Sequence, residues 1–330
     1  MADLKTIKGF KVESLATDPS VIGQVYYNTA SNTLKYVTTV GAWATGGTAN
    51  QLRGDVGSAS SGNTQTAAIA FGGYYNPVGN MANAETYNGT AWTAITALPA
   101  ARAGIRGLGT STAALAVDGD NVGYKNDCYE WDGSSWTAGG STTTYRRGAS
   151  CAGTQTSGLV TLGSGKYPST TPGQGTRTEE YDGTSWTAGG DQLFSAGGSS
   201  GTGTQTSAIN TGSNPPHKAE TQTYDGSSWT EVGDLNNGRD NGAGWGTQTA
   251  MMFAGGDTGS PQTTFVETYD GSTWTETTNF STPRGPNNVG GGTTTVGLLG
   301  FGYAPVPAGN FSNATEEWTV GPTTKTVTAT

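Results

Sequence analysis

The residues that could support catalysis in this sequence are few: one histidine and two cysteines stand among scattered carboxylates. His217 directly follows Pro215 and Pro216, and a histidine in such a loop is poorly placed to activate a serine or cysteine nucleophile. Cys128 and Cys151 are 23 residues apart, in no metal-binding or redox spacing, so two free thiols are favoured over a disulfide. We therefore expect no catalytic residue, no metal site and no cofactor, and we expect that the protein is not an enzyme.

Arginine is the charged residue that recurs at a fixed place in the sequence. Five of the eight arginines stand just before the same repeated strand: Arg53, Arg102, Arg147, Arg239 and Arg284. A ring of guanidinium groups could bind an anionic glycan or a carboxylate through paired donors. Each arginine could instead pair with a glutamate that recurs in the same repeat, at Glu85, Glu179, Glu267 and Glu316. One copy of the repeat has Ser195 in place of arginine and also lacks the glutamate, so we favour ion pairs within the fold over a ligand site.

The composition indicates an all-β protein. The 330 residues include 54 glycines and 13 prolines, and only 12% are charged and 33% apolar, so the core must be spread over many short elements. Strand and turn formers dominate, whereas common helix formers are scarce. The net charge of −9, with no basic stripe, argues against nucleic acid as a partner. No apolar run approaches the roughly 20 residues of a membrane span, and the N-terminus has no signal-peptide pattern, so we expect neither membrane insertion nor a secretory route.

Two short strings recur through almost the whole chain. The first runs from an aromatic residue through Asp or Asn and Gly to a tryptophan, and it ends at Trp92, Trp136, Trp186, Trp229 and Trp274. The second, Gly-Thr-Gln-Thr or a close variant, occurs six times at intervals of 43 to 50 residues. Asp-Gly between two strand-like runs predicts a tight hairpin. Each repeat therefore predicts four short strands, named a to d, and six such repeats fit the blades of a β-propeller better than the coils of a solenoid. The tryptophans are expected to pack between sheets rather than to form one ligand site.

The repeats also carry a family resemblance. The glycine-ended strands 71–73 and 253–256, followed by Tyr-Asp-Gly and then Trp, resemble kelch repeats of the galactose-oxidase-like propellers over about residues 50–320. Gly-Thr-Gln-Thr-Ala followed by Glu-x-Tyr-Asp-Gly-x-Ser-Trp-Thr is similar to kelch-like propellers of tailed bacteriophages, including marine and cyanophage types, and residues 23–36 resemble a hairpin of phage tail-fibre proteins. The resemblance implies a six-bladed kelch-like β-propeller in a virion or tail-fibre protein. It does not extend to the copper chemistry of galactose oxidase, which needs two histidines.

The first 48 residues differ in kind from the rest. They lack the repeat and hold half of the lysines, so we predict an N-terminal attachment segment with a short β-hairpin at 1–48 and a propeller at 49–330. The last repeat lacks its second tryptophan, while Trp43 stands unpaired near the N-terminus. We expect residues 40–47 to supply the fourth strand of the last blade, with the strand-like run 324–330 as the alternative. Because an isolated hairpin is marginally stable, we favour docking of this segment on a neighbouring subunit over docking on its own propeller, which leaves a homo-oligomer open.

Function is expected where the repeats differ from one another. The a–b and c–d turns are nearly the same in every repeat, whereas the b–c loops vary and carry six candidate binding residues: Tyr74, Tyr75, Tyr124, Tyr167, His217 and Tyr303. Such side chains suit stacking on sugars or docking of a protein loop.

The leading hypothesis from the sequence is a non-enzymatic phage structural protein, made in the host cytoplasm and carried on the virion as a tail-fibre or capsid-displayed component. Its N-terminal segment would bind other virion proteins, and its loops would bind a host-surface glycan or protein. One alternative is a capsid decoration or adaptor protein that contacts only other virion proteins. A carbohydrate-active enzyme is a further and less favoured alternative.

Overall fold

The computed structural model describes residues 12–161, 163, 174–194, 197–213, 217–259, 262–285, 289–304 and 310–327. The chain divides into two compact units: unit 1 comprises Met1–Ala42 and Thr319–Thr330, and unit 2 comprises Trp43–Trp318. This division groups residues 319–330 with the N-terminal segment, whereas the sequence predicted a propeller over residues 49–330. Two long strands, β3 (Thr33–Thr45) and β30 (Thr315–Thr326), contribute residues to both units.

Unit 2 is all-β, and its described residues form small antiparallel sheets that are consistent with a β-propeller. Sheet 1 contains β4 (Gly57–Ser58), β5 (Ala68–Phe71), β8 (Ala84–Tyr87) and β9 (Trp92–Ile95). Sheet 2 contains β10 (Arg106–Gly109), β11 (Ala114–Val117), β12 (Cys128–Trp131) and β13 (Trp136–Ala138). Sheet 3 contains β14 (Ser150–Thr154), β15 (Ser157–Thr161), β16 (Thr178–Tyr181) and β17 (Trp186–Ala188).

Sheet 4 contains β18 (Ser200–Thr204), β19 (Ser207–Ser213), β20 (Lys218–Tyr224) and β21 (Trp229–Val232). Sheet 5 contains β22 (Ala243–Thr247), β23 (Ala250–Ala254), β24 (Val266–Tyr269) and β25 (Trp274–Glu276). In sheet 6, β26 (Val289–Gly292), β27 (Val296–Gly300) and β30 are followed by β3, so the fourth strand comes from the N-terminal part of the chain.

Three short elements lie between the b and c strands of their repeats. They are the hairpin β6 (Tyr74–Tyr75) with β7 (Gly79–Asn80), the hairpin β28 (Tyr303–Ala304) with β29 (Asn310–Phe311), and the 3-10 turn η1 (Gln174–Thr176). Among the described residues, no helix is long and apolar enough to cross a membrane.

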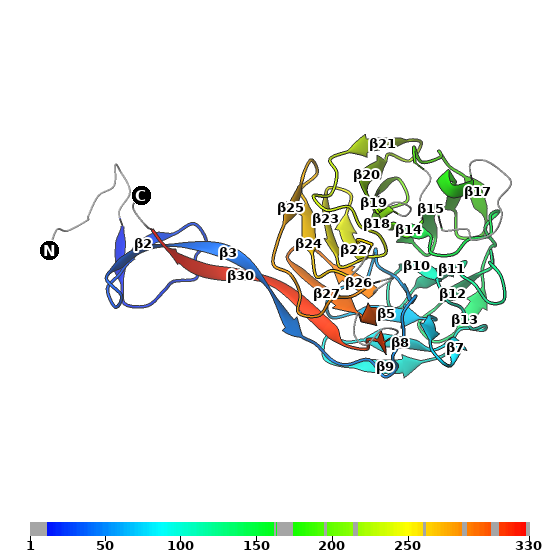
Figure 1. Ribbon diagram of the computed structural model, residues 1–330, viewed down its shortest axis with the longest axis horizontal. Helices are drawn as coiled ribbons and strands as arrows, with labels where there is room; N and C mark the ends of the chain where they lie inside the picture. The colour runs from blue at the N-terminus through cyan, green and yellow to red at the C-terminus, as the bar shows by residue number, and fades with distance from the viewer. Residues whose placement is uncertain are drawn as a thin grey trace. The chain divides into compact units, whose positions relative to one another are not determined.

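The a strands of the sheets lie next to one another in unit 2. They contact in the succession β4, β10, β14, β18, β22, β26, and β26 contacts β4 again. Figure 1 shows the sheets side by side around a common centre. Glycine permits this close approach, since a Cβ atom at Gly201 would lie 2.3 Å from Ser150 Oγ and one at Gly244 would lie 2.8 Å from Ser200 Oγ.

The predicted c–d hairpins are confirmed in five sheets, where the aromatic residue of strand c pairs with the tryptophan of strand d, as Tyr224 does with Trp229. In sheet 4, Asp225 Oδ1 accepts the backbone N–H groups of Ser227 and Ser228 at 2.8 Å each. Gly226 has a φ of 95°, a left-handed conformation that glycine adopts without steric cost. The Asp-Gly pair therefore determines both the cap and the reversal of the chain.

The repeated tryptophans lie in the core, between sheets. Each one packs on the aromatic residue that opens its hairpin, with ring centroids 4.8 to 5.2 Å apart. Each indole N–H also reaches the preceding sheet, as when Trp186 Nε1 donates to Gly140 O at 2.9 Å. The rings thus fill the space between sheets without leaving a buried donor unpaired.

Two polar contacts recur between successive sheets. The glutamine of Gly-Thr-Gln-Thr donates to strand c of the preceding sheet, as Gln205 Nε2 does to Tyr181 O at 2.8 Å. The tyrosine of strand c donates to a glutamate of that sheet, as Tyr224 does to Glu180 at 2.6 Å. Sheet 1 makes both contacts with β30 of sheet 6: Gln65 Nε2 donates to Trp318 O, and Tyr87 donates to Glu317.

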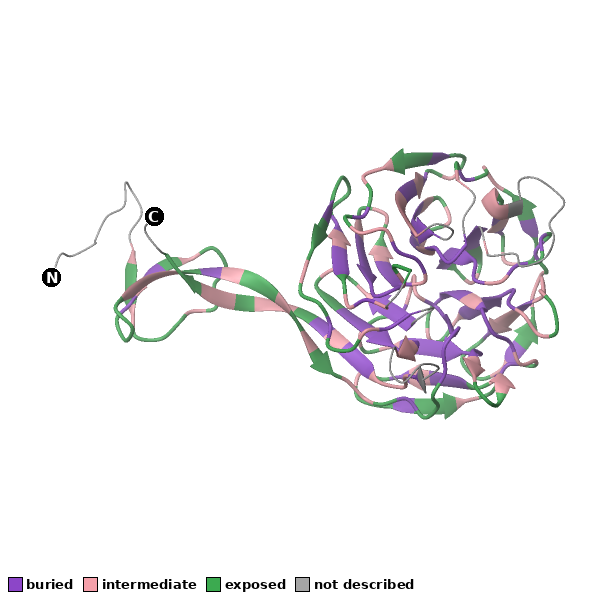
Figure 2. Ribbon diagram, in the orientation of Figure 1, coloured by how far each residue is buried: buried purple, intermediate pink, exposed green. Residues whose placement is uncertain are grey.

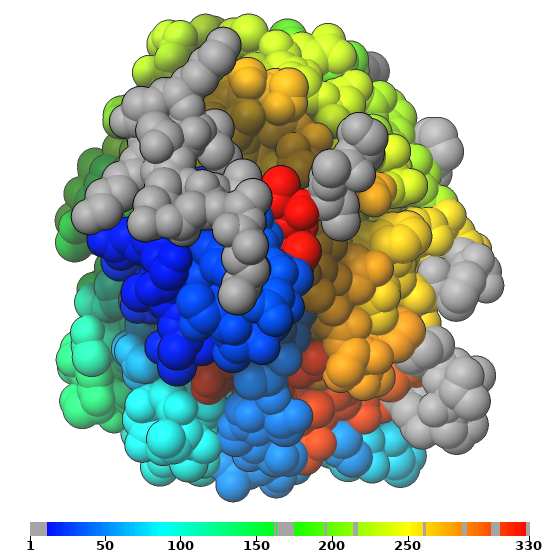
Figure 3. All heavy atoms as spheres, turned by 90° about the vertical axis from the view of Figure 1, so that its left-hand side faces the viewer, coloured from blue at the N-terminus to red at the C-terminus, as the bar shows by residue number. Residues whose placement is uncertain are grey.

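Unit 1 is a small sheet in which β1 (Glu13–Leu15) pairs in parallel with β2 (Val25–Asn28), and β2 pairs antiparallel with β3. Strands β3 and β30 lie side by side here, where blue and red atoms adjoin in Figure 3. Val327 N donates to Leu34 O. The carboxylate of Asp18 accepts hydrogen bonds from Lys35 and from Thr324, so it connects the N-terminal and C-terminal parts of the chain. Tyr26 and Val37 are its buried hydrophobic residues, and most of its described surface is exposed or half-buried (Figure 2).

Candidate binding face

The d–a and b–c segments emerge on the same side of antiparallel four-stranded sheets, and we call this side of unit 2 the loop face. Large hydrophobic side chains are exposed mainly there. Of the seven such residues in the described part of unit 2, six lie in d–a or b–c segments: Leu52, Val78, Val122, Tyr145, Leu193 and Phe265. The seventh, Val296, opens β27 on the opposite side. Apolar groups that face water in one region mark a surface suited to binding.

The opposite side, the turn face, is polar and repetitive. It carries the c–d turns, in which Asp132, Asp182, Asp225 and Asp270 each accept two backbone N–H groups, and Asn88 does the same in sheet 1. These hydrogen bonds hold the pKa of the four carboxyl groups below their ordinary value, to about 2 in Asp225 and Asp270. Each carboxylate is thus engaged in its own turn.

Three of the predicted binding tyrosines come together on the loop face. Tyr303 lies 4.5 Å from Phe311 between ring centroids, Tyr75 lies 5.4 Å from it and Tyr74 lies 6.0 Å from it. The two hairpins β6–β7 and β28–β29 thus join into one aromatic cluster, although they are more than 200 residues apart in the sequence. Burial raises the pKa of Tyr303, so its hydroxyl stays protonated.

His217 and Tyr124 belong to the b–c loops of other sheets. Nδ1 of His217 lies 3.3 Å from the carboxylate of Asp240, which is buried at the end of the next d–a segment. Tyr124 forms a backbone bridge with Asp120 in the b–c loop of sheet 2. Tyr167 lies outside the described residues.

The buried arginines pair inside the fold. Arg53 pairs with Glu85 at 2.9 Å, Arg284 pairs with Glu316 at 2.8 Å, and Arg239 forms a short contact with Glu267. The glutamates also accept a backbone N–H from the preceding d–a segment, as Glu267 does from Asn236. These guanidinium groups are at most 1% exposed, so the pairs hold the d–a segments in place rather than meeting a ligand.

One member of the predicted set is corrected in sheet 3. Arg146, not Arg147, pairs with Glu179 there. Arg147 points elsewhere: its Nη2 atom donates to Asp55 at 2.6 Å and its Nη1 atom lies 3.4 Å from Asp120. Because Asp55 precedes sheet 1 and Asp120 follows strand b of sheet 2, Arg147 links three sheets across the loop face. The prediction of Arg147 was therefore wrong at this point, where two arginines stand in a row.

Sheets 2 and 4 depart from the arginine–glutamate pattern. In sheet 2, Tyr129 occupies the glutamate position, and Arg102 pairs with Asp127 and lies 3.1 Å from the Tyr129 hydroxyl. In sheet 4, Gln222 takes the glutamate position and accepts the backbone N–H of Leu193. Ser195, the predicted arginine position of that sheet, lies outside the described residues.

The groups with potential for chemistry are dispersed in the part of the chain that the structure describes. Cys128 and Cys151 are free, as predicted, and both are buried; burial raises the pKa of the Cys151 thiol to about 12. Over the same residues, His, Cys, Asp and Glu side chains do not gather in threes as a metal site would need. The arrangement offers aromatic and apolar contacts and hydrogen-bonding groups, which are means of binding.

Comparison with known proteins supports the fold and gives no information on activity. No family model matches the chain, and no curated protein matches it. The solved structure of YjhT superposes on it with a TM-score of 0.66 and 13% sequence identity, over 84% of this chain and 99% of that one. At this identity the likeness shows a shared fold and carries nothing about activity.

Proposed function

We propose that unit 2 is a six-bladed kelch-like β-propeller, closed where β3 completes the sixth blade. The succession of a strands that returns from β26 to β4 supports this. So do the contacts of Gln65 and Tyr87 with β30, which repeat those between the other sheets. Trp43 then occupies the d-strand tryptophan position of the sixth blade, where its ring lies 5.3 Å from that of Trp318.

The propeller serves, in this proposal, as the recognition module of a non-enzymatic phage virion protein, displayed on a tail fibre or on the capsid. The observation that carries the proposal is the concentration of exposed apolar side chains on the loop face, opposite a polar and repetitive turn face. The cluster of Tyr74, Tyr75 and Tyr303 adds flat aromatic surface of the kind that binds sugars and peptides. The ligand is a host-surface glycan or protein.

Unit 1 is, in this proposal, the attachment module that binds other virion proteins. Its described residues expose six large hydrophobic side chains, a high number for so small a unit: Val21, Ile22, Val25, Tyr36, Val40 and Val327. Val25 and Tyr36 are cross-strand partners on one face of its sheet. Such a face gains stability when a partner covers it.

Binding to a panel of bacterial surface glycans and to whole bacterial cells tests the proposal, with Val122→Ser/Tyr145→Ser as the loop-face variant. The matched control is Val296→Ser, which removes an exposed apolar side chain from the turn face. We expect saturable binding to at least one surface, weakened about tenfold or more in the loop-face variant and unchanged in the control. Equal binding by both variants would refute the role of the loop face. Binding to virion proteins alone would favour a decoration or adaptor role instead.

A further inference from the structure

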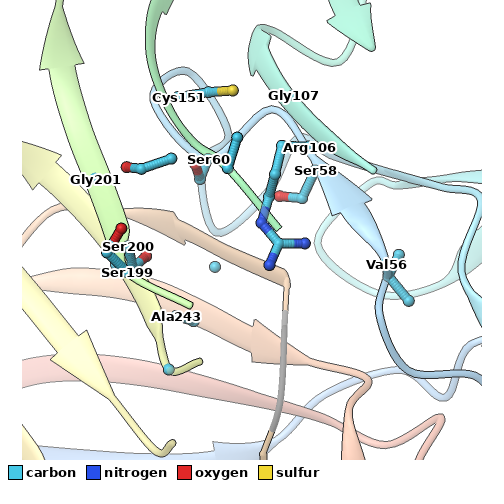
Figure 4. Close-up of a pocket in the computed structure, with 15 residues that line it drawn as sticks. Val56, Ser58, Ser60, Arg106, Gly107, Cys151, Ser199, Ser200, Gly201 and Ala243 are labelled. Carbon is cyan, nitrogen blue, oxygen red and sulfur yellow. The ribbon is translucent and has the colours of Figure 1, made fainter. Parts of the chain in front are cut away.

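One pocket of unit 2 lies within a single sheet. Figure 4 shows a different pocket, which lies among the a strands and is lined by small residues of several sheets and by Arg106. The pocket of interest lies in sheet 4, between β19, β20 and the d–a segment that precedes the sheet, and we call it the sheet 4 pocket. Its lining is mostly polar and includes Gln192, Phe194, Asn210, Gly212, Glu220 and Gln222.

Sheet 4 lacks the buried arginine–glutamate pair of its neighbours. In the sheets that have the pair, the arginine stands three residues after the residue whose backbone N–H the glutamate accepts, as Arg239 stands after Asn236. In sheet 4, Gln222 accepts the backbone N–H of Leu193, so the same spacing leads to Ala196. Alanine supplies no guanidinium group and glutamine supplies no charge. Both members of the ion pair are therefore absent from this sheet.

The sheet 4 pocket occupies the place that the guanidinium group fills in sheet 5. There, Arg239 donates from Nε to Gly255 O at 3.0 Å and from Nη2 to Phe253 O at 3.3 Å. The strand pairing makes Gly212 and Asn210 the equivalents of these two residues in sheet 4, and both line the pocket. Gly212 also has the same φ of 68° as Gly255. The backbone thus keeps the same course in both sheets, whereas sheet 4 has no arginine to occupy the space.

Two buried amides of the pocket stand where the other sheets have mainly apolar residues. Asn210 and Gln192 are each 4% exposed. Asn210 lies opposite Gln222, and the residues opposite the glutamate position in sheets 1, 2, 3 and 5 are Ala70, Ala116, Val160 and Phe253. The residues equivalent to Gln192 in the other five d–a segments are Ala49, Leu98, Thr142, Leu235 and Phe280. Packing of the sheets therefore does not require an amide at either position.

These amides leave hydrogen-bonding atoms without partners. Asn210 Nδ2 donates to Gln192 Oε1 at 3.3 Å. Gln192 Nε2 and Asn210 Oδ1 are buried and have no hydrogen-bond partner among the described residues. Exchange of nitrogen and oxygen in both amides would again leave one donor and one acceptor. The Oε2 atom of Glu220 is a further buried acceptor without a partner. Such atoms cost free energy unless an occupant of the pocket pairs with them.

The charges and the donor–acceptor set of the pocket suit a neutral ligand with hydroxyl groups. Oε1 of Glu220 lies 3.3 Å from Lys218 Nζ, which balances its charge, and the other lining side chains are uncharged. A hydroxyl group both accepts and donates, so it can pair with the free amide donor and with a free acceptor at the same time. The half-buried ring of Phe194 adds an apolar wall. The pocket is partly open, so a hydroxyl group can enter it from a ligand that extends outside.

We propose that the sheet 4 pocket is a subsite of the loop face for a neutral sugar, whose hydroxyl groups pair with Gln192, Asn210 and Glu220. Its position fits, because Gln192 belongs to a d–a segment and the pocket lies where β19 ends and β20 begins. This inference rests on the proposed function of the loop face and names its ligand as a glycan rather than a protein.

Saturation-transfer difference NMR of the full-length protein tests the proposal, with the methyl glycosides of glucose, galactose, mannose and N-acetylglucosamine as probes. We expect saturable binding of at least one glycoside. Gln192→Leu/Asn210→Val, which copies Leu235 and Val160, should raise its Kd by about tenfold or more. The control Gln51→Leu, which removes an exposed carboxamide from the d–a segment before sheet 1, should leave the Kd unchanged. Binding of none of the four glycosides, or binding that survives in the double variant, would overturn the proposal.

Thermal unfolding gives a readout that a purely structural role of the amides would move the other way. Because the double variant removes buried polar atoms that lack partners, we expect its Tm without sugar to equal or exceed that of the parent protein. A saturating glycoside should raise the Tm of the parent and not that of the variant. If the double variant fails to fold, Asn210→Ala replaces it, and an unchanged Kd in Asn210→Ala would refute the subsite.

Whole-cell binding separates this inference from the proposed function. If bacterial cells bind the parent protein and the double variant equally while no glycoside binds, the sugar subsite is refuted and the loop face keeps its proposed role. If glycosides bind to the parent and not to the double variant while cells bind neither, the subsite is supported and the proposed role in host recognition is refuted.

Discussion

At the scale of single residues, the buried ion pairs contribute most clearly to stability. Arg239 and Glu267 are both fully buried, so removing one charge leaves the other without compensation. We expect Arg239→Ala to lower the free energy of unfolding by about 3–5 kcal/mol. The double variant Arg239→Met/Glu267→Leu, which removes both charges, should lose less than the single one. Urea unfolding measures both, with Arg177→Ala as the exposed control.

The ion pairs also show how much of the structure around single residues could be predicted from the sequence. The recurring spacing predicted four glutamates that would pair with an arginine, and all four do. It wrongly chose Arg147 over Arg146 in sheet 3, because adjacent residues of a d–a segment point in different directions and only the fold determines which one faces the sheet.

At the scale of elements, the c–d turn is the most strongly encoded feature, and its aspartates make it sensitive to acid. The backbone N–H groups of Ser228 and its equivalents lower the carboxyl pKa values in the folded state below the ordinary 3.8. Since the folded-state pKa is the lower one, the stabilisation is complete above about pH 4 and is lost as the pH falls toward about 2.

A fourfold variant tests this acid sensitivity. Replacing Asp132, Asp182, Asp225 and Asp270 with asparagine keeps an acceptor oxygen in each turn, as Asn88 does naturally in sheet 1. We expect Tm near pH 7 to change little and the fall in Tm between pH 4 and pH 2 to become shallower than in the parent protein. An identical acid slope would mean that other carboxylates control acid unfolding.

Strand lengths and boundaries were harder to predict from the sequence than the turns were. Asp-Gly pairs fix local dihedral angles, so five hairpins could be predicted from adjacent residues. Strand β3, in contrast, runs for 13 residues through Gly41 and beyond the predicted hairpin, because pairing with β30 stabilises it. The sequence predicted a hairpin in the N-terminal segment and a fourth strand at residues 40–47 as separate elements, and no local pattern predicts that they form one continuous strand beside β30. The aromatic cluster around Phe311 depends on long-range packing in the same way.

At the scale of the whole molecule, we expect the presence of Trp43 to determine how stable a truncated chain is. Its ring lies 5.3 Å from Trp318 and 5.8 Å from Phe280, and its indole N–H donates to Thr278 O. A chain of residues 43–318 keeps these contacts, whereas a chain of residues 49–318 loses them. We expect the shorter chain to lose about 3–5 kcal/mol of unfolding free energy relative to the longer one.

Thermal unfolding and light scattering of the two truncated chains give the comparison, with the full-length protein as the reference. If residues 49–318 were as stable as residues 43–318, Trp43 would have no structural role in unit 2. If the full-length protein associates while residues 43–318 stay monomeric, unit 1 holds the self-association surface.

The pairing of β3 with β30 also has a consequence for biosynthesis. Just beyond the paired strands, Ala49 N donates to Asn313 O, and these two residues are 264 positions apart in the chain. At the usual pace of translation, the ribosome needs on the order of tens of seconds to bridge that interval. Throughout that time the nascent β3 has one edge without its partner, and a second ribosome on the same message carries an identical open edge close by. Emergence of β30, rather than emergence of the first sheet, is the event that ends this exposure.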